Sequence, residues 1–320
     1  MIELSRRAAI GAGLAGAAAA LSAGSATGTA GSPFFKRTGL PIGLQLYTLG
    51  DGLKADLDGQ LAQVAKAGYR SVELAGYLGR TPKELRAAFD KAGLICPSAH
   101  VQARSSAEAP GLADIDKVIA DAQVIGVKHI VLPMFAIPAH VNMTPGPGDD
   151  RRAVLSRMAA QMTADDWKAC ADLLNAKAAP LKAAGLTLGY HNHNVEFAPV
   201  GGTTGMDILL KNTDPSLVNF EMDAGWVVAA GADPFALLKA QPHRFTQMHV
   251  KDVKATTKPN FAFQQDPTEV GSGTIDWKRL LPASYAAGVR GYFVEQEAPY
   301  DKPRMESVRI SGEYLGKLVA

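Results

Sequence analysis

The stretch Ala164–Asn194, ADDWKACADLLNAKAAPLKAAGLTLGYHNHN, holds one complete helix–strand unit. Apolar residues first recur at helical spacing and then form a short run, which predicts a helix over Ala164–Ala184 and a strand over Leu186–His191. Gly185 between them suits the left-handed position that ends many helices. The strand ends on the polar sequence His-Asn-His (residues 191–193), and this combination of a buried strand with a polar end recurs along the chain.

The same alternation runs outward in both directions, from Leu40 onward, with Gly, Pro, Asp or Thr at the joints. The predicted strands are Ile42–Tyr47, Ser71–Ala75, Leu94–Ala99, His129–Pro133, Leu186–His191, Leu217–Met222, Phe245–Val250 and Arg290–Gln296. The predicted helices include Asp58–Ala67, Pro82–Ala92, Ile115–Ile125, Ala164–Ala184, Pro234–Ala240 and Trp277–Ala287. Several of them end in glycine, at Gly68, Gly93, Gly126, Gly185 and Gly288. Three predicted helix starts carry a capping aspartate, at Asp165, Asp233 and Asp276.

Eight strand–helix units predict a single-domain α/β fold, the (β/α)8 or TIM barrel. An open doubly wound sheet is the alternative, but it often has a Gly-rich turn after its first strand, whereas Tyr47-Thr48-Leu49-Gly50 follows here. Two connections, 134–163 and 251–274, are long. Both lead from a strand to a helix, so we expect both on the face where barrels build active sites. Residues 303–320 predict a terminal helix.

The composition is that of a globular protein with a large core, because 47% of the 320 residues are hydrophobic and 20% are charged. The formal net charge is +2, and Lys and Arg are scattered, so the sequence offers no basic stripe for nucleic acid. Cys96 and Cys170 fall in a predicted strand and a predicted helix, and we expect two buried thiols rather than a disulfide.

The first 30 residues predict an export signal. Ser5-Arg6-Arg7 precedes an uncharged stretch of mostly Ala, Gly, Ser, Leu and Thr. Adjacent arginines favour the twin-arginine route and hence a periplasmic, exported protein. A membrane anchor is the alternative, but glycine and alanine dilute the apolar character too much for a stable span. We therefore expect a signal peptide over 1–30, a linker over 31–39 and the catalytic domain over 40–320.

Polar residues at the predicted strand ends require an explanation, because a barrel core favours branched apolar side chains. They are Glu73, His100, His191, Asn192, His193, Asp223, His249, Lys251, Glu295 and Glu297. A lone imidazole there is more often a hydrogen-bonded structural residue, whereas several imidazoles among carboxylates favour a divalent cation that offsets the cost of their burial. Mixed His and carboxylate ligands suit Mn²⁺, Zn²⁺, Co²⁺ or Fe²⁺ better than Ca²⁺.

Seven segments on these strand ends resemble the sugar phosphate isomerase/epimerase family of xylose isomerase-like TIM barrels (the AP endonuclease 2 superfamily), which also includes endonuclease IV-type proteins. They are GLQLYTL (43–49), VELAG (72–76), YHNHN (190–194), EMDAGW (221–226), MHVKD (248–252), GSGTIDW (271–277) and FVEQE (293–297). The resemblance covers about Leu40 to Ala298 and depends on the order of the segments, since each is a weak signal by itself.

The resemblance implies one divalent metal ion held by groups from strands five to eight. Carried over by position, the ligands are His191, Asp223, His249 and Glu295. His191 departs from the family, because most sugar epimerases have a glutamate there that also forms an acid–base pair with the strand-eight glutamate. Trp226 is a second departure, since many relatives carry a histidine. Simple two-base epimerisation at C3 is therefore not implied by these residues.

Other polar residues are candidates for the remaining roles. The candidate catalytic residues are His193, Lys251, Glu73 and Glu295. His193 is a candidate base because residues two apart on a strand point the same way, and Lys251 is a candidate fixed positive charge for a developing oxyanion. The candidate substrate contacts are His100, Asn192, Glu196, Trp226 and Glu297. Structural hydrogen bonding is the alternative role for each.

The leading expectation is a metal-dependent isomerase or epimerase that removes a proton next to a carbonyl of a small-molecule sugar or keto-sugar. The alternative is a 3-keto-glycoside lyase, in which the same proton removal expels a β-leaving group. Two other classes are weaker. An endonuclease IV-like phosphoesterase would need several metals and a basic groove, and a sugar-binding protein would need no metal ligands. No nucleic acid partner and no stable membrane anchor are expected, and assembly as a homo-oligomer is compatible with the sequence.

Overall fold

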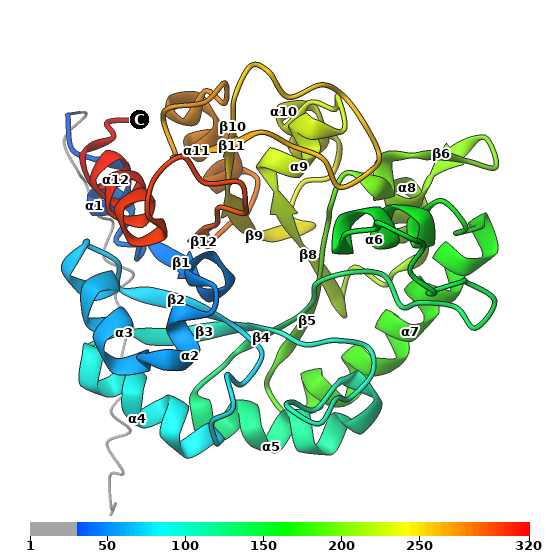
Figure 1. Ribbon diagram of the computed structural model, residues 1–320, viewed down its shortest axis with the longest axis horizontal. Coiled ribbons are helices and arrows are strands. Elements are labelled where there is room, and N and C mark those ends of the chain that lie inside the picture. Colours follow the sequence, from blue (N-terminus) through cyan, green and yellow to red (C-terminus); the bar gives the residue numbers. More distant parts are fainter. Residues whose placement is uncertain (1–30) are drawn as a thin grey trace, which may run out of the picture.

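The computed structural model describes residues 31–320, so the predicted signal peptide lies outside the described residues. Eight parallel strands close into a barrel, and the helices form a ring around it (Figure 1). Around the barrel the strand order is β1, β12, β9, β8, β5, β4, β3 and β2. These strands span Gly43–Gln45 (β1), Ser71–Ala75 (β2), Ile95–His100 (β3), His129–Leu132 (β4), Thr187–His191 (β5), Val218–Asp223 (β8), Phe245–Val250 (β9) and Gly291–Val294 (β12). The predicted single-domain TIM barrel is confirmed.

The helices agree with the predicted pattern within a few residues and add several that it did not identify. They are α1 (Phe34–Thr38), α2 (Gly52–Ala55), α3 (Leu57–Lys66), α4 (Pro82–Ala92), α5 (Ile115–Ile125), α6 (Arg151–Ala159), α7 (Ala164–Ala183), α8 (Gly205–Asn212), α9 (Ala224–Ala229), α10 (Pro234–Ala240), α11 (Trp277–Ala286) and α12 (Arg304–Lys317). Both long loops contain structure. The first carries α6, and the second carries the short pair β10 (Asp252–Val253) and β11 (Pro267–Thr268). Another short pair, β6 (Pro199–Val200) and β7 (Thr203–Thr204), follows β5.

Local capping explains where the helices begin and end. Asp233 and Asp276 cap α10 and α11 as predicted. The prediction for Asp165 is wrong, because Thr163 caps α7 and forms a capping box with Asp166. A threonine hydroxyl and an acidic side chain three residues later satisfy each other's backbone N–H groups, so the helix starts earlier than the aspartate pattern indicates. Gly185 has the expected positive φ, 76°.

The segment predicted as a linker instead joins the folded domain. Within residues 31–39, Phe34 and Phe35 of α1 are buried, and the Phe34 ring lies edge-on to Tyr292. The Phe34 N–H also donates to the Leu318 carbonyl at 2.8 Å, so α1 is attached near the end of α12. Two aromatic side chains in a row provide enough apolar area to dock a five-residue helix.

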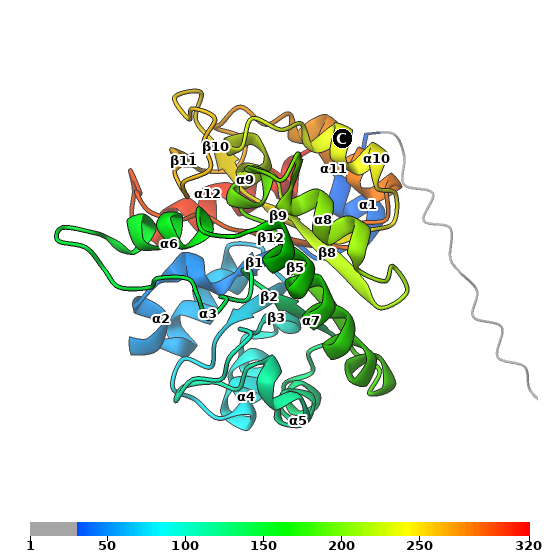
Figure 2. The ribbon, with the colours of Figure 1, turned by 90° about the vertical axis from the view of Figure 1, so that its right-hand side faces the viewer.

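Parallel register brings the polar strand ends to one face of the barrel. Asp223 pairs with His249 across β8 and β9, and His191 pairs with Glu221 across β5 and β8. Figure 2 shows the loop before α6 projecting from the same side of the barrel as α2 and the β10–β11 pair. Cys96 and Cys170 are free buried thiols, as predicted. Among the described residues, no helix is both long and apolar enough to span a membrane.

Candidate active site

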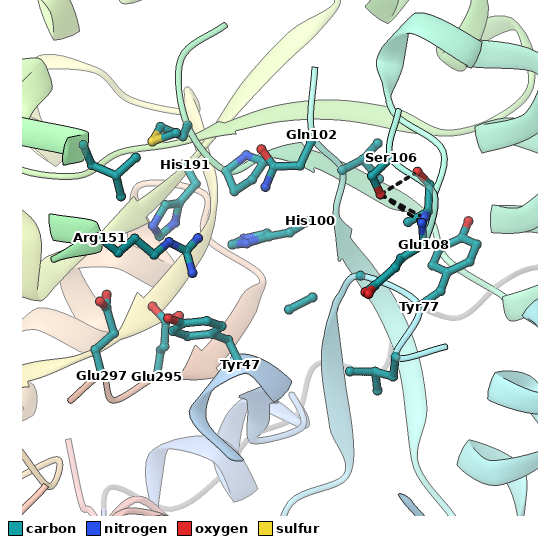
Figure 3. A pocket seen from close by; sticks show the side chains of 18 of the residues that line it. Tyr47, Tyr77, His100, Gln102, Ser106, Glu108, Arg151, His191, Glu295 and Glu297 are labelled. Carbon is teal, nitrogen blue, oxygen red and sulfur yellow. Dashed lines mark hydrogen bonds between the residues drawn. The ribbon is translucent and has the colours of Figure 1, made fainter. Parts of the chain in front are cut away.

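A cavity of about 550 Å³ opens at the carboxyl ends of the barrel strands. His100, His191 and Glu295 line it from three different strand ends. Figure 3 shows these side chains around the opening, with Tyr47 and Glu297 beside Glu295 and the Arg151 side chain reaching in from α6. The cavity therefore combines strand-end groups with a side chain from the first long loop, as TIM-barrel active sites do.

Lys251 is the central cation of the buried polar cluster. Its Nζ lies 2.7 Å from a carboxylate oxygen of each of Asp223, Glu295 and Glu297. Its side chain is fully buried, and the ammonium lies 5.0 Å from the centre of the Trp226 ring. Burial lowers the pKa of Lys251, but the three carboxylates raise it more, so the pKa lies well above its usual value. Lys251 is therefore a fixed positive charge.

The pKa values of its carboxylate partners Asp223 and Glu295 shift downward instead. Burial raises the pKa of Asp223, but Lys251, His249 and His191 lower it further, so the net shift is downward. Glu295 follows the same pattern, and Lys251 and His249 hold its pKa well below the usual value. Both carboxyl groups are therefore ionised at neutral pH, and their oxygens can act as metal ligands.

A second group of polar side chains surrounds Nε2 of His249, on the opposite side of the imidazole from Glu295. His249 Nε2 is 2.6 Å from Glu73 Oε2 and 3.1 Å from Glu221 Oε2. His100 Nε2 is 2.9 Å from the same Glu221 oxygen and 3.2 Å from Glu73 Oε2. Gln45 and Ser98 donate to Glu73 at 2.8 and 2.6 Å, which fixes that carboxylate in place.

These contacts change the acidity of the imidazoles in different directions. Burial lowers the pKa of His249, but Glu221, Glu295 and Glu73 outweigh it and raise the value well above normal. His191 lacks comparable support, so burial and the charge on His249 lower its pKa to about 4. Burial raises the pKa of Glu73, and the negative charge of Glu221 adds to the increase.

The residues present fit a divalent cation. One potential ligand atom from each of His191, Asp223, His249 and Glu295 lies within 4.8 Å of all the others, and all four side chains are buried. Four carboxylates are buried here. Within the described part of the chain, Asp223 and Glu295 pair with the ammonium of Lys251, whereas Glu73 and Glu221 pair only with imidazoles. Such an excess of buried negative charge is costly unless a cation or bound protons compensate it. Imidazole and carboxylate donors together match the preferences of first-row transition metals.

His193, the predicted base, lies at the wall of the cavity. Its ring centre is 4.9 Å from that of His191 and 5.0 Å from that of Phe263. Nδ1 of His193 has no hydrogen-bond partner among the described residues. Burial lowers its pKa well below the usual value, and the charges of His191 and Lys251 contribute in the same direction. His193 is therefore a neutral imidazole with a free nitrogen.

Glu196, a predicted substrate contact, is turned away from the cavity. It is fully buried, accepts from the Tyr190 hydroxyl at 2.7 Å and accepts from the His193 backbone N–H at 2.8 Å. Burial raises its pKa to about 7. Its position next to Tyr190 makes it a support for the backbone of His193 rather than a substrate contact.

The other predicted residues divide into those that line the cavity and those that lie behind it. His100 and Glu297 line it. Asn192 is buried, and its side chain accepts from the Asp223 backbone N–H at 3.1 Å, so it positions a predicted ligand. Trp226 lies behind Glu297 and donates to it at 3.2 Å. Glu73 and Lys251 are also fully buried, so they act on the cavity through neighbouring side chains.

Sequence reasoning did not identify Glu221 or Arg151 as site residues. Glu221 precedes Asp223 by two positions on β8, and the period of a strand places both side chains on the same face. That signal was present in the sequence. Arg151 belongs to a helix inside a long loop, and no local pattern indicates that its side chain reaches the cavity.

Known proteins resemble this chain in sequence and in fold. An inosose dehydratase from Geobacillus kaustophilus is 26% identical over 278 residues, covering 82% of this chain and 87% of that protein. The structure of a sugar phosphate isomerase/epimerase from Parabacteroides distasonis has a TM-score of 0.68 at 26% identity, covering 87% of this chain and 94% of that one. A xylose isomerase-like TIM barrel protein from Mycobacterium smegmatis, solved in complex with magnesium, shares the fold with a TM-score of 0.61 at 16% identity, covering 88% of this chain and 96% of that one.

The family itself is identified by a match over nearly the whole described chain. Residues 61–318 fit the xylose isomerase-like TIM barrel family, and this range contains all but the first of the barrel strands. The resemblance seen in the sequence is therefore confirmed, and the chain belongs to the xylose isomerase-like TIM-barrel family.

Proposed function

We propose that this protein is a metal-dependent lyase that removes a proton next to the carbonyl of a keto-sugar or keto-cyclitol and expels a β-leaving group. The proposed ligands of the ion are His191, Asp223, His249 and Glu295, whose donor atoms converge. A divalent cation held there would polarise the ketone oxygen and make the adjacent C–H bond more acidic. The dehydratase relatives support this reaction class.

The observation that carries the proposal is the loss of a free carboxylate pair. An epimerase that uses two bases needs one on each face of the substrate. Here the fifth barrel strand ends in His191, and Glu295 Oε2 is held by Lys251 at 2.7 Å and by His249 at 3.0 Å. Elimination needs only one proton-transfer group. His193, a neutral imidazole that lines the cavity, meets that need.

The proposed reaction balances with this single base. His193 accepts the proton as the C–H bond next to the carbonyl breaks. The electron pair forms a C=C bond while the C–O bond at the next carbon breaks. The departing oxygen, a hydroxyl in a dehydration or a glycosidic oxygen in a 3-keto-glycoside, takes the proton back from His193. Lys251 keeps Asp223 and Glu295 ionised during these steps.

Isomerisation or epimerisation is the second candidate. The Parabacteroides distasonis relative, which bears that name, is as similar in sequence to this chain as the dehydratase is. Both reactions begin with the same proton removal, and only the fate of the electron pair differs. The end of the reaction, rather than its start, therefore separates the two.

The test is incubation of metal-loaded protein with keto-sugars, inososes and 3-keto-glycosides in D₂O, followed by NMR and mass spectrometry. A lyase yields an unsaturated ketone that has lost water or the aglycone. Deuterium in a product that keeps all its oxygens would instead establish the isomerase or epimerase. Matched incubations without metal provide the control.

A further inference from the structure

The imidazoles of His191 and His249 each face two separate sets of carboxylates. On the mouth side, His249 Nδ1 is 3.0 Å from Glu295 Oε2, and His191 Nε2 is 3.7 Å from Asp223 Oδ2. On the inner side, the opposite ring nitrogens turn to Glu221. His249 Nε2 is 3.1 Å and His191 Nδ1 is 3.3 Å from its Oε2.

The inner side gains a third imidazole from a strand that takes no part in the mouth-side set. The two names only distinguish the Glu221 side from the Glu295 side, since His100 itself lines the cavity. His100 of β3 places Nε2 2.9 Å from Glu221 Oε2. These four donors, His100, His191, Glu221 and His249, all lie within 4.8 Å of one another. The three imidazole nitrogens lie 2.9, 3.3 and 3.1 Å from Glu221 Oε2, close to the edge of about 3.3 Å of a tetrahedron with bonds of 2.0–2.1 Å.

Hydrogen bonding alone does not account for this arrangement. Three ring nitrogens point at one carboxylate oxygen, which has only two lone pairs. Among the described residues, His191 Nδ1 has no hydrogen-bond partner, although its side chain is buried. An unsatisfied buried nitrogen is costly, and a cation between the donors would satisfy it.

The two sides also differ in whether a lysine ammonium lies beside their carboxylates. Lys251 already places an ammonium 2.7 Å from both Asp223 and Glu295 on the mouth side. On the inner side, the ion pairs of Glu73 and Glu221 within residues 31–320 involve imidazoles alone, without lysine or arginine. The inner carboxylates are thus the ones that lack a permanent cation.

We propose that the barrel contains a second, inner metal site made by His100 Nε2, His191 Nδ1, Glu221 Oε2 and His249 Nε2. Three imidazoles and one carboxylate suit Zn²⁺ or Co²⁺. A neutral imidazole has one lone pair for a metal, so an ion on the inner side and an ion on the mouth side compete for His191 and His249. The protein then binds one ion per chain at either of two positions.

The test measures binding and coordination rather than turnover. Apo protein is titrated with Co²⁺ or Zn²⁺ by calorimetry, and X-ray absorption counts the imidazole nitrogens around the ion. Three imidazoles indicate the inner position and two indicate the mouth position. His100→Gln removes an inner ligand alone, and Asp223→Asn and Glu295→Gln each remove a mouth ligand alone. His129→Gln is the matched control, because it removes an imidazole of β4 that hydrogen-bonds to Thr187 and belongs to neither set of ligands.

We expect Asp223→Asn and Glu295→Gln to retain one ion with three imidazole ligands. His100→Gln should lose this signal, and its affinity for the inner position should fall more than about 100-fold, since loss of even an outer-shell partner costs about 10–100-fold. Circular dichroism confirms that each variant is folded, and the two mouth variants serve as replacements for each other if one does not fold.

The outcomes separate this inference from the proposed function. If His100→Gln keeps its ion with two imidazoles while both mouth variants lose theirs, the inner site is refuted and the mouth ligands stand. If the mouth variants keep an ion that His100→Gln loses, the inner site stands and the proposed mouth ligands fail. If wild-type protein binds neither metal, both proposals fail.

Discussion

Replacing Lys251 with methionine tests the electrostatic balance of the site. Lys251→Met keeps the length of the buried stem and removes only the ammonium, so packing changes little. The variant leaves Asp223, Glu295 and Glu297 without the cation that lies 2.7 Å from each. Removing one partner of a buried ion pair costs about 3–5 kcal/mol because it leaves uncompensated charge. We therefore expect a loss of that size in the free energy of unfolding at pH 7.

The pH dependence of this loss follows from the same contacts. In the wild type, the pKa values of Asp223 and Glu295 are depressed. Their ionised forms therefore contribute stability above the usual carboxyl pKa, and that stability is lost as pH falls through the depressed values. Without Lys251, the largest cause that lowers both pKa values is removed, so both values shift upward and protonation relieves the variant as pH falls. The difference between the two proteins should narrow from pH 7 towards about pH 4.

Urea unfolding of chelator-treated protein at several pH values measures the effect. Lys254→Met is the matched control, because Lys254 pairs with Asp266 and Asp301 at the surface and its loss should change stability much less. Mn²⁺ should restore part of the lost stability of Lys251→Met, since a divalent cation can take over the carboxylates. Equal stability of Lys251→Met and wild type at pH 7 in chelator would refute the reasoning.

Three further predictions concern the base, its support and the export signal. His193→Ala should keep the bound metal yet lose about 10²–10⁴-fold in turnover, the usual contribution of a positioned base, and near-normal turnover would remove it from the mechanism. Burial raises the pKa of Glu196 from 4.5 to about 7, so wild-type stability should decline as pH rises across that window, whereas Glu196→Gln should flatten this part of the unfolding profile. Changing both Arg6 and Arg7 to lysine should leave the protein in the cytoplasm with its signal peptide uncut, as measured by cell fractionation and immunoblotting. Normal periplasmic levels of this variant would contradict a twin-arginine signal.

The sequence by itself determined the elements of the barrel and the face on which its site lies. Apolar periodicity and terminal glycines are local properties, and they located strands such as Phe245–Val250 and helices such as Pro82–Ala92 within a few residues. The carboxyl ends of parallel strands in a closed barrel meet at one face. For this reason, His191, Asp223, His249 and Glu295 were predictable as neighbours before any coordinates were known.

Only the tertiary structure decided which polar groups touch and which nitrogen of each imidazole faces which carboxylate. The register between β5, β8 and β9 brings Glu221 close to His191 and His249, and closure of the barrel adds His100 from β3; no local pattern contains these contacts. The same holds for Lys251, which extends beneath Trp226 to three carboxylates, and for Glu196, which turns back to Tyr190. These contacts join residues from different strands, so their distances depend on barrel closure and side-chain packing rather than on spacing along the chain.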